Sequence, residues 1–307
     1  MQFTFHNTVS IFLSIIIFAC APYSLPRERS LYNEENAFKF YKSSIDYFFA
    51  HEYQLALETI QKAIDMNQSY AQFHKFKGDI YFHINELDKA LLSYQNAIFY
   101  RSNFADVYQR MGEIYVMHGN YDDALKAYHK VLVSDQKEIN AFLKLADCYL
   151  EIEEFELALN NLKDYENVAN EYNIVPETEY YFLLGKVYFK LERYDDAIKN
   201  LHKISHIFDV RVYYFLGRCY YSIDKYDAGL VYFNKLLNFD NSVGEYYLYR
   251  GLYFYKKNDL EDAKKQFKIA LELDESQKDA HYYLGKIYEL TGNREEAERE
   301  FQIYNAN

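Results

Sequence analysis

The side chains best placed for chemistry in this sequence are two histidines at helical spacing. His202 and His206 are four residues apart, which puts both imidazoles on one face of a helix. A metal site would need a third ligand, and the Glu of a metalloprotease motif is absent. No Gly-rich phosphate loop, nucleophile elbow or carboxylate dyad stands out, and Asp and Glu are spread as on solvated helix faces. We therefore predict no catalytic residue, no metal and no cofactor, in a chain that is not an enzyme.

Composition narrows the class of protein further. The 307 residues include only 10 Gly and 3 Pro, too few turn formers for a β-sandwich or barrel. Half the residues are hydrophobic and 26% are charged, as in a globular chain. The net charge of -12 repels a phosphate backbone and no basic patch offsets it, so we expect no nucleic acid partner.

The N-terminus contains an apolar run at residues 9–19. Its 11 residues are too few for a membrane-spanning helix, which needs about 20, but they suit a signal peptide. We predict a signal peptide at residues 1–19 and an exported protein.

The end of this run resembles a bacterial lipobox. The residues are Ile17-Phe18-Ala19-Cys20, in which a Cys follows a small residue, although Phe18 is bulkier than usual and the first eight residues hold no Lys or Arg. By this resemblance Cys20 is diacylated and becomes the mature N-terminus, and two acyl chains anchor a protein durably in a membrane. Ordinary secretion, with cleavage after Ala21, or an uncleaved anchor stays open, although Pro22 disfavours that cleavage.

The elements that must position any site repeat along the chain about every 34 residues. Six glycines are each followed three residues later by an aromatic residue, and Ser44 and Ala146 replace Gly in two further repeats. The small residues are Ser44, Gly78, Gly112, Ala146, Gly185, Gly217, Gly251 and Gly285. A second small residue stands twelve places after each, and four places later come Ile60, Tyr94, Tyr128, Leu162, Leu201, Phe233, Phe267 and Phe301. Small and large residues at such offsets predict paired amphipathic helices whose backbones approach closely.

This pattern resembles the tetratricopeptide repeat (TPR). The resemblance implies an all-α, right-handed solenoid of eight helix-turn-helix repeats, after a linker at residues 20–36. We place repeats one to four at 37–177 and repeats five to eight at 178–307. The spacing between repeats four and five is five residues longer and includes Pro176, which predicts an extended last helix in repeat four and a subdomain boundary there.

Cys148 and Cys219 occupy equivalent, mostly apolar places in repeats four and six. We expect two buried thiols without a disulfide, because a whole repeat separates them.

The resemblance also indicates a ligand groove along the first helices of the repeats. Its ninth places are acidic in repeats two to four, at Asp79, Glu113 and Asp147, and basic in repeats five, six and eight, at Lys186, Arg218 and Lys286, with Leu252 in repeat seven. Aromatic residues stand at fifth and twelfth places, namely Phe182, Tyr214, Tyr282, Phe189, Tyr221 and Tyr255. Residues 37–177 have a net charge of -9 and residues 178–307 of -2.

We hypothesise that repeats five to eight bind an acidic or C-terminal peptide segment and that repeats two to four prefer a basic surface. The alternative is that a Tyr-rich composition and scattered charge produce the pattern. The carboxylate clamp of chaperone-binding TPRs is not matched, because Asp79 stands in place of an Asn.

The function expected from these features is a non-catalytic scaffold or adaptor, anchored in the bacterial envelope, that binds a protein or peptide partner. One alternative is a self-assembling envelope protein that stacks through an uncapped C-terminal repeat, although the polar last helix could also cap itself. A remote alternative is an RNA-binding helical repeat, which the negative charge opposes.

Overall fold

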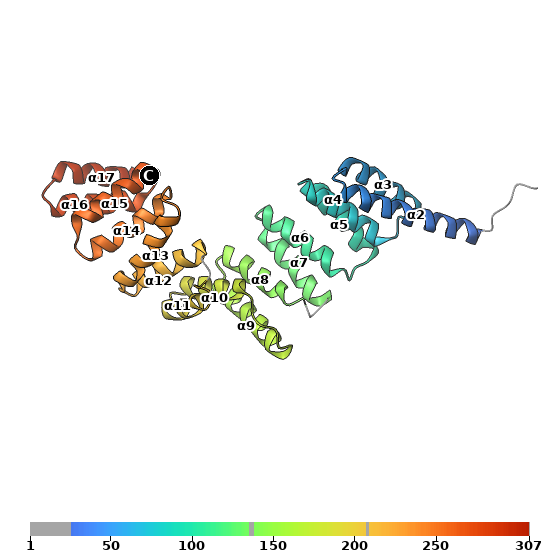
Figure 1. Cartoon of the computed structure of the whole chain (residues 1–307), viewed down its shortest axis with the longest axis horizontal. Helices are drawn as coiled ribbons and strands as arrows, with labels where there is room; N and C mark the ends of the chain where they lie inside the picture. Colours follow the sequence, from blue (N-terminus) through green and yellow to red (C-terminus); the bar gives the residue numbers. More distant parts are fainter. Residues whose placement is uncertain (1–25, 135–137, 207–208, 307) are drawn as a thin grey trace, which may run out of the picture. The chain divides into compact units, whose positions relative to one another are not determined.

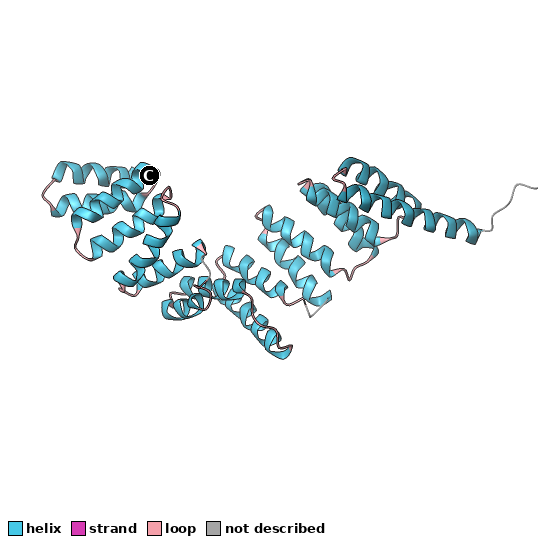
Figure 2. Cartoon of the chain, viewed as in Figure 1, coloured by secondary structure: helices cyan, strands magenta, loops and turns pink. Residues whose placement is uncertain are grey.

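A computed structural model describes residues 26–134, 138–206 and 209–306 of the chain, and these residues form helices joined by short loops (Figure 2). They divide into two compact units, and the division along the sequence falls after Asn120. In the first unit the helices are α2 Pro26–Phe49, α3 Tyr53–Met66, α4 Ala71–His83, α5 Leu87–Tyr100 and α6 Ala105–Met117 (Figure 1).

The second unit continues the same alternation of two helices per repeat (Figure 1). Its helices are α7 Tyr121–Ser134, α8 Asn140–Glu151, α9 Phe155–Glu171, α10 Thr178–Lys190, α11 Tyr194–His202, α12 Val210–Ser222, α13 Tyr226–Phe239, α14 Gly244–Lys256, α15 Leu260–Leu273, α16 Lys278–Leu290 and α17 Arg294–Ala306. The fold is an all-α repeat solenoid. None of the described helices combines the length and apolarity that crossing a membrane requires.

The close approach of paired helices depends on the small residues of the repeat. A Cβ added to Gly217 in α12 would collide with the ring of Phe233 in α13, which is fully buried. Gly251 stands in the same relation to Phe267, sixteen residues further along. The predicted pairing of small and large residues is confirmed, because each glycine leaves the space that a ring of the second helix fills.

The turn inside each repeat requires one residue with left-handed backbone. Gly119 and Gly292 supply it with φ of 69° and 80°. In the other repeats the turn residue is not Gly and still has φ near 60°, as the backbone gives for His51, Asn85, Glu153, Glu192, Asp224 and Asn258. Asn, Asp and Gly tolerate this conformation best, so the turns at Glu153 and Glu192 are held by the helices on either side.

The first helix begins earlier than the repeat pattern predicts. Residues 20–36 were expected to form a linker, but α2 begins at Pro26 and runs without a break into the first repeat. Proline fits the first turn of a helix, where its missing N–H is not needed, and no Gly or Pro follows until the first repeat is complete. Helical propensity therefore extends the helix beyond the repeat pattern.

The link between repeats four and five is not a boundary between compact units. The second helix of repeat four, α9, has 17 residues, three more than α7. One buried cluster includes residues of α8, α9 and α10, and Tyr165 stacks on Tyr180 with ring centroids 4.9 Å apart. The extended helix adds core contacts across the link around Pro176, whereas the division into two compact units falls after Asn120.

The last helix has a polar outer side. Among the residues of α17 only Ala297 is buried, and the exposed residues are Glu295, Glu296, Glu298, Arg299, Gln302, Asn305 and Ala306 as well as Arg294. This surface offers little apolar area for stacking on a second copy.

Candidate functional site

The guanidinium of Arg218 lies among aromatic rings of three first helices. Its central carbon is 4.6 Å from the ring centroid of Phe189 in α10, 5.2 Å from that of Tyr214 in α12 and 5.4 Å from that of Tyr249 in α14. These distances are within the range of cation–π attraction. The side chain is therefore held by packing rather than by a counter-ion.

The local sequence explains why this arrangement is rigid. Gly217, the neighbour of Arg218, lets Phe233 reach α12, and Phe233 stacks on Tyr249 with centroids 5.0 Å apart. The hydroxyl of Tyr253 donates a hydrogen bond to the carbonyl oxygen of Gly217. Side chains of the core thus fix both the backbone beside Arg218 and one of the rings that face it.

The electrostatic partners of Arg218 are neutral. Its Nη1 donates to the hydroxyl of Tyr214 at 3.1 Å, and that hydroxyl donates to Glu245. Burial and the bond to Glu245 raise the pKa of Tyr214, which stays a neutral phenol. Among the described residues no carboxylate forms an ion pair with Arg218, so its charge is available to a ligand.

A pocket of about 420 Å³ opens beside this guanidinium, and we call it the Arg218 pocket. It is lined by Phe189, Tyr194, Arg218, Tyr221, Ser222, Tyr249, Leu252, Asp279, Tyr282, Tyr283 and Tyr304. Most of these residues come from the first helices of repeats five to eight, and Tyr304 comes from the last turn of α17. The pocket combines one cation, one carboxylate and a wall of aromatic rings.

Comparison with known families identifies the repeat. Residues 78–119 match the family model described as TPR repeat, and residues 210–242 and 248–305 match models described as tetratricopeptide repeat. Residues 117–204 match the model for subunit 3 of the anaphase-promoting complex, or cyclosome. The chain is a TPR protein. Among curated proteins, none matches its sequence significantly.

Solved TPR structures share the fold at low sequence identity. A tetratricopeptide repeat protein from Parabacteroides merdae is 17% identical, with a TM-score of 0.59 over 82% of this chain and 98% of that one. PilW, a type IV pilus biogenesis factor, is 16% identical with a TM-score of 0.53, over 66% of this chain and 92% of its own. The Cut9–Hcn1 hetero-tetramer of the APC/C is 17% identical, with a TM-score of 0.59. The match covers 91% of this chain and 52% of that one. TPR proteins are generally non-catalytic scaffolds for protein–protein interaction.

The other two basic ninth places of this TPR array are already paired. Lys186 donates to Glu151 at 3.0 Å and lies 3.9 Å from Asp147. Two carboxylates of repeat four therefore lie near the basic ninth place of repeat five, with Glu151 closer than the ninth-place Asp147. This pair explains why Lys186 offers a ligand less net charge than the sequence suggests.

Lys286 is paired within its own helix. Its Nζ lies 3.2 Å from Glu289, and this hydrogen bond raises the pKa of Lys286. The same ammonium is 5.9 Å from the ring of Tyr282 and 5.8 Å from that of Phe301. Of the three predicted basic groove residues, only Arg218 has no acidic partner among the described residues.

The predicted aromatic residues fall into different environments. Phe189, Tyr221 and Tyr282 line the Arg218 pocket, and Tyr214 binds the guanidinium from the side. Phe182 is only 5% exposed and is part of the core. Tyr255 packs edge-to-face against Tyr283, itself a lining residue, with centroids 5.0 Å apart.

In the first compact unit the predicted acidic residues have partners close by in sequence. Asp79 accepts from Lys75 at 2.9 Å and from the hydroxyl of Tyr94 at 2.8 Å. Glu113 pairs with Arg110 at 2.9 Å. The preference of repeats two to four for a basic surface stays a prediction.

The remaining candidates for chemistry have structural roles or lie elsewhere. Cys148 and Cys219 are buried free thiols, and burial raises the pKa of each to about 12. His202 accepts or donates a 2.9 Å hydrogen bond with Tyr220, and burial lowers its pKa. Within the described residues no group of three metal-ligating side chains comes together. Cys20, the predicted lipidation site, lies outside the described residues.

Seven of the eleven residues that line the Arg218 pocket are not among the predicted groove residues, and Tyr249, Asp279 and Tyr304 are three of them. Tyr249 stands at the sixth place of its repeat, Asp279 at the second place, and Tyr304 in the last turn of α17. A prediction based on fifth, ninth and twelfth places does not include them. Their role depends on how neighbouring helices converge.

Proposed function

We propose that this TPR protein is an envelope-anchored adaptor that binds an acidic, carboxylate-ended peptide segment of a protein partner in the Arg218 pocket. The observation that carries the proposal is the unpaired guanidinium of Arg218, held by three rings at the mouth of an aromatic pocket. Arg and aromatic residues are the usual anchors of protein interfaces.

The pocket chemistry favours a peptide over a simple anion. Arg218 can bind a carboxylate through two parallel N–H donors. Asp279 lines the same pocket and would repel a bare anion, but it can accept a backbone N–H. An extended peptide supplies both groups, and its side chains can lie against Tyr221 and Tyr282.

The test uses the full chain and a fluorescein-labelled pentapeptide that ends in two acidic residues and a free carboxylate. Arg218→Gln should weaken binding about tenfold, as expected for a charge-assisted hydrogen bond. Lys186→Gln is the matched control and should change affinity less than about twofold, because that charge is already shared with Glu151 and Asp147. Equal losses in both variants would show that the peptide responds to net charge and not to the pocket.

Anchoring is a separate part of the proposal and rests on the lipobox resemblance at Cys20. When the full chain is expressed in a bacterial host, it should incorporate labelled palmitate and fractionate with membranes. Cys20→Ala should abolish the label and release the chain into the soluble fraction, because two acyl chains are needed for stable binding. Membrane retention of an unlabelled Cys20→Ala chain would instead support an uncleaved N-terminal anchor.

A further inference from the structure

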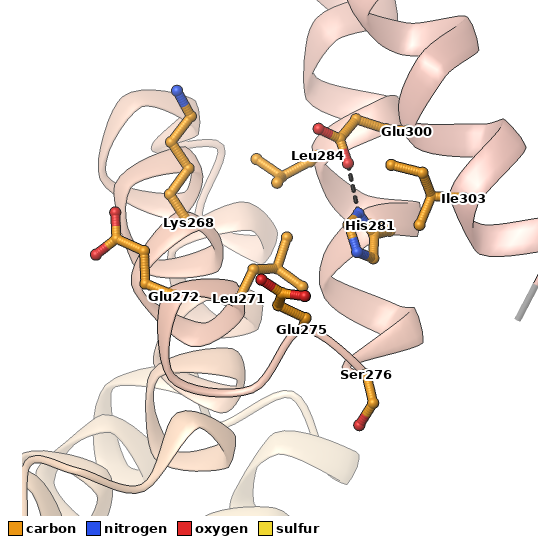
Figure 3. Close-up of a pocket in the computed structure, with 9 residues that line it drawn as sticks. All are labelled: Lys268, Leu271, Glu272, Glu275, Ser276, His281, Leu284, Glu300 and Ile303. Atoms are coloured by element: carbon orange, nitrogen blue, oxygen red, sulfur yellow. Dashed lines mark hydrogen bonds and ion pairs between the residues drawn. The ribbon is translucent and has the colours of Figure 1, made fainter.

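A second and larger pocket is lined by residues of α15, α16 and α17. Its volume is about 710 Å³, and its lining residues are Lys268, Leu271, Glu272, Glu275, Ser276, His281, Leu284, Glu300 and Ile303 (Figure 3). We call it the His281 pocket. None of these residues lines the Arg218 pocket. The volume is in the range of sites that hold a small ligand or a few peptide side chains.

Aliphatic side chains from three helices form the apolar part of this pocket. Leu271 comes from α15, Leu284 from α16 and Ile303 from α17 (Figure 3). Leu284 is 1% exposed and belongs to the core, whereas Ile303 and Leu271 are half-buried. An aliphatic ligand group would therefore bury apolar surface that these two side chains leave open.

A histidine–carboxylate pair forms one wall. His281 Nδ1 lies 2.6 Å from an oxygen of Glu300, and the two side chains are 11% and 19% exposed. Because a carboxylate accepts, the Nδ1 atom of His281 carries the proton. Nε2 makes no hydrogen bond with another described residue, and in neutral His281 it is an acceptor.

The corresponding histidine of repeat two has its Nε2 in use. His74 Nε2 lies 2.7 Å from the carbonyl oxygen of Gln68, in the turn that precedes its own helix. In repeat eight, His281 instead bonds through Nδ1 to Glu300 of α17, and it has no corresponding bond to the preceding turn. Of these two histidines, only His281 has an Nε2 atom without a hydrogen bond to another described residue.

The charged residues of the pocket favour a cationic ligand. Glu272 lies at the end of α15 and Glu275 in the following turn, and of the two Glu275 lies nearer the His281–Glu300 pair in Figure 3. Neither forms an ion pair with a described residue, and Lys268 is the single Lys or Arg among the lining residues. The lining groups therefore have a net negative charge.

We propose that the His281 pocket binds a basic, aliphatic peptide segment of a protein partner. An aliphatic side chain of the segment packs on Leu271 and Ile303, and a neighbouring Lys or Arg pairs with Glu272 and Glu275. An N–H of the segment donates to His281 Nε2. The acidic lining excludes a nucleic acid backbone, and the apolar part distinguishes the site from a solvated acidic surface.

The test measures fluorescence anisotropy of the full chain with a fluorescein-labelled peptide Leu-Lys-Leu-Arg-Leu, amidated at its C-terminus. A second peptide with Glu in place of both basic residues serves as the opposite probe. Both peptides are titrated into the Arg218→Gln chain, so that the Arg218 pocket does not contribute acidic binding. We expect the basic peptide to bind and the acidic peptide to bind at least about fivefold more weakly. Binding of neither peptide, or equal binding of both, would overturn the proposal.

Paired variants separate the pocket from general charge. The double variant Glu272→Gln and Glu275→Gln should weaken the basic peptide at least about fivefold. The control double variant Glu296→Gln and Glu298→Gln removes the same charge from the exposed side of α17 and should change affinity less than about twofold. Equal losses would mean diffuse attraction and would refute a site.

A third variant tests the apolar part without a change of charge. Ile303→Ser should also weaken the basic peptide, with an unchanged far-UV circular dichroism spectrum showing that α17 is intact. Unchanged affinity would overturn the role of the aliphatic residues. Arg218→Gln should leave this binding unchanged, so the two sites can fail independently.

Discussion

The Arg218 pocket and the His281 pocket are built from the same repeats but differ in chemistry. The first is lined by rings of the first helices around an unpaired cation, and the second by aliphatic side chains and carboxylates around a histidine. One TPR frame can therefore present opposite charge preferences within a few repeats. The charge that each pocket offers depends on which of its charged side chains already form ion pairs with other residues of the chain.

The largest expected effect comes from removing the core beneath one pocket at a time. Phe233→Ala should lower the free energy of unfolding by about 3–5 kcal/mol, because the ring is fully buried and its loss leaves a cavity under Tyr249. Leu284→Ala should cost about 2–5 kcal/mol beneath the other pocket. Urea unfolding followed by circular dichroism measures both.

Because repeats contact only their neighbours, each core variant should damage mainly its own pocket. Under native conditions, Phe233→Ala should weaken the acidic peptide and keep the basic one. Leu284→Ala should weaken the basic peptide more than the acidic one, because α16 also lines the Arg218 pocket. Equal loss of both peptides in either variant would mean that the two pockets do not rest on separate parts of the core.

The next effect concerns the shape of the cation rather than its charge. Arg218→Lys keeps the charge but loses the planar group that stacks on Phe189 and Tyr214. We expect about fivefold weaker binding of the acidic peptide, which corresponds to about 1 kcal/mol. Anisotropy titration measures it, and full retention of affinity would mean that the rings do not orient the cation.

Much of this difference between the pockets lies beyond reach of the sequence alone. The repeat pattern could be predicted because every repeat needs a small residue where a large side chain of its second helix packs, as at Gly217 and Phe233. The ion pair of Lys186 could not be predicted, because its partner Glu151 is 35 residues away and belongs to another repeat. The position of Tyr304 in the Arg218 pocket likewise depends on how the last helix packs. Pairing across repeats is set by the angle between helices, which residue spacing does not encode.

A smaller effect should come from two adjacent residues of α17. Tyr304 lines the Arg218 pocket and Ile303 lines the His281 pocket. Tyr304→Ala should weaken only the acidic peptide and Ile303→Ala only the basic peptide, each about threefold to fivefold, because each side chain is partly buried. Parallel titration of both variants with both peptides makes each the control for the other.

The smallest expected effect is that of salt. Raising NaCl from about 50 to 500 mM should weaken both peptides by about twofold to threefold, since both sites use partly exposed charges. Isothermal titration at the two concentrations tests it. A site whose affinity is unaffected by salt would depend on apolar contacts alone.

The last turn of α17 contributes a wall to both pockets, and this joins them thermodynamically. Helix ends fray, and any fraying of this turn would withdraw Ile303 and Tyr304 together. A ligand that holds this turn in place for one pocket spares the other ligand the cost of ordering it. Linkage requires the benefit to be mutual and equal, so a partner carrying both an acidic end and a basic aliphatic segment would be held cooperatively by one turn of helix.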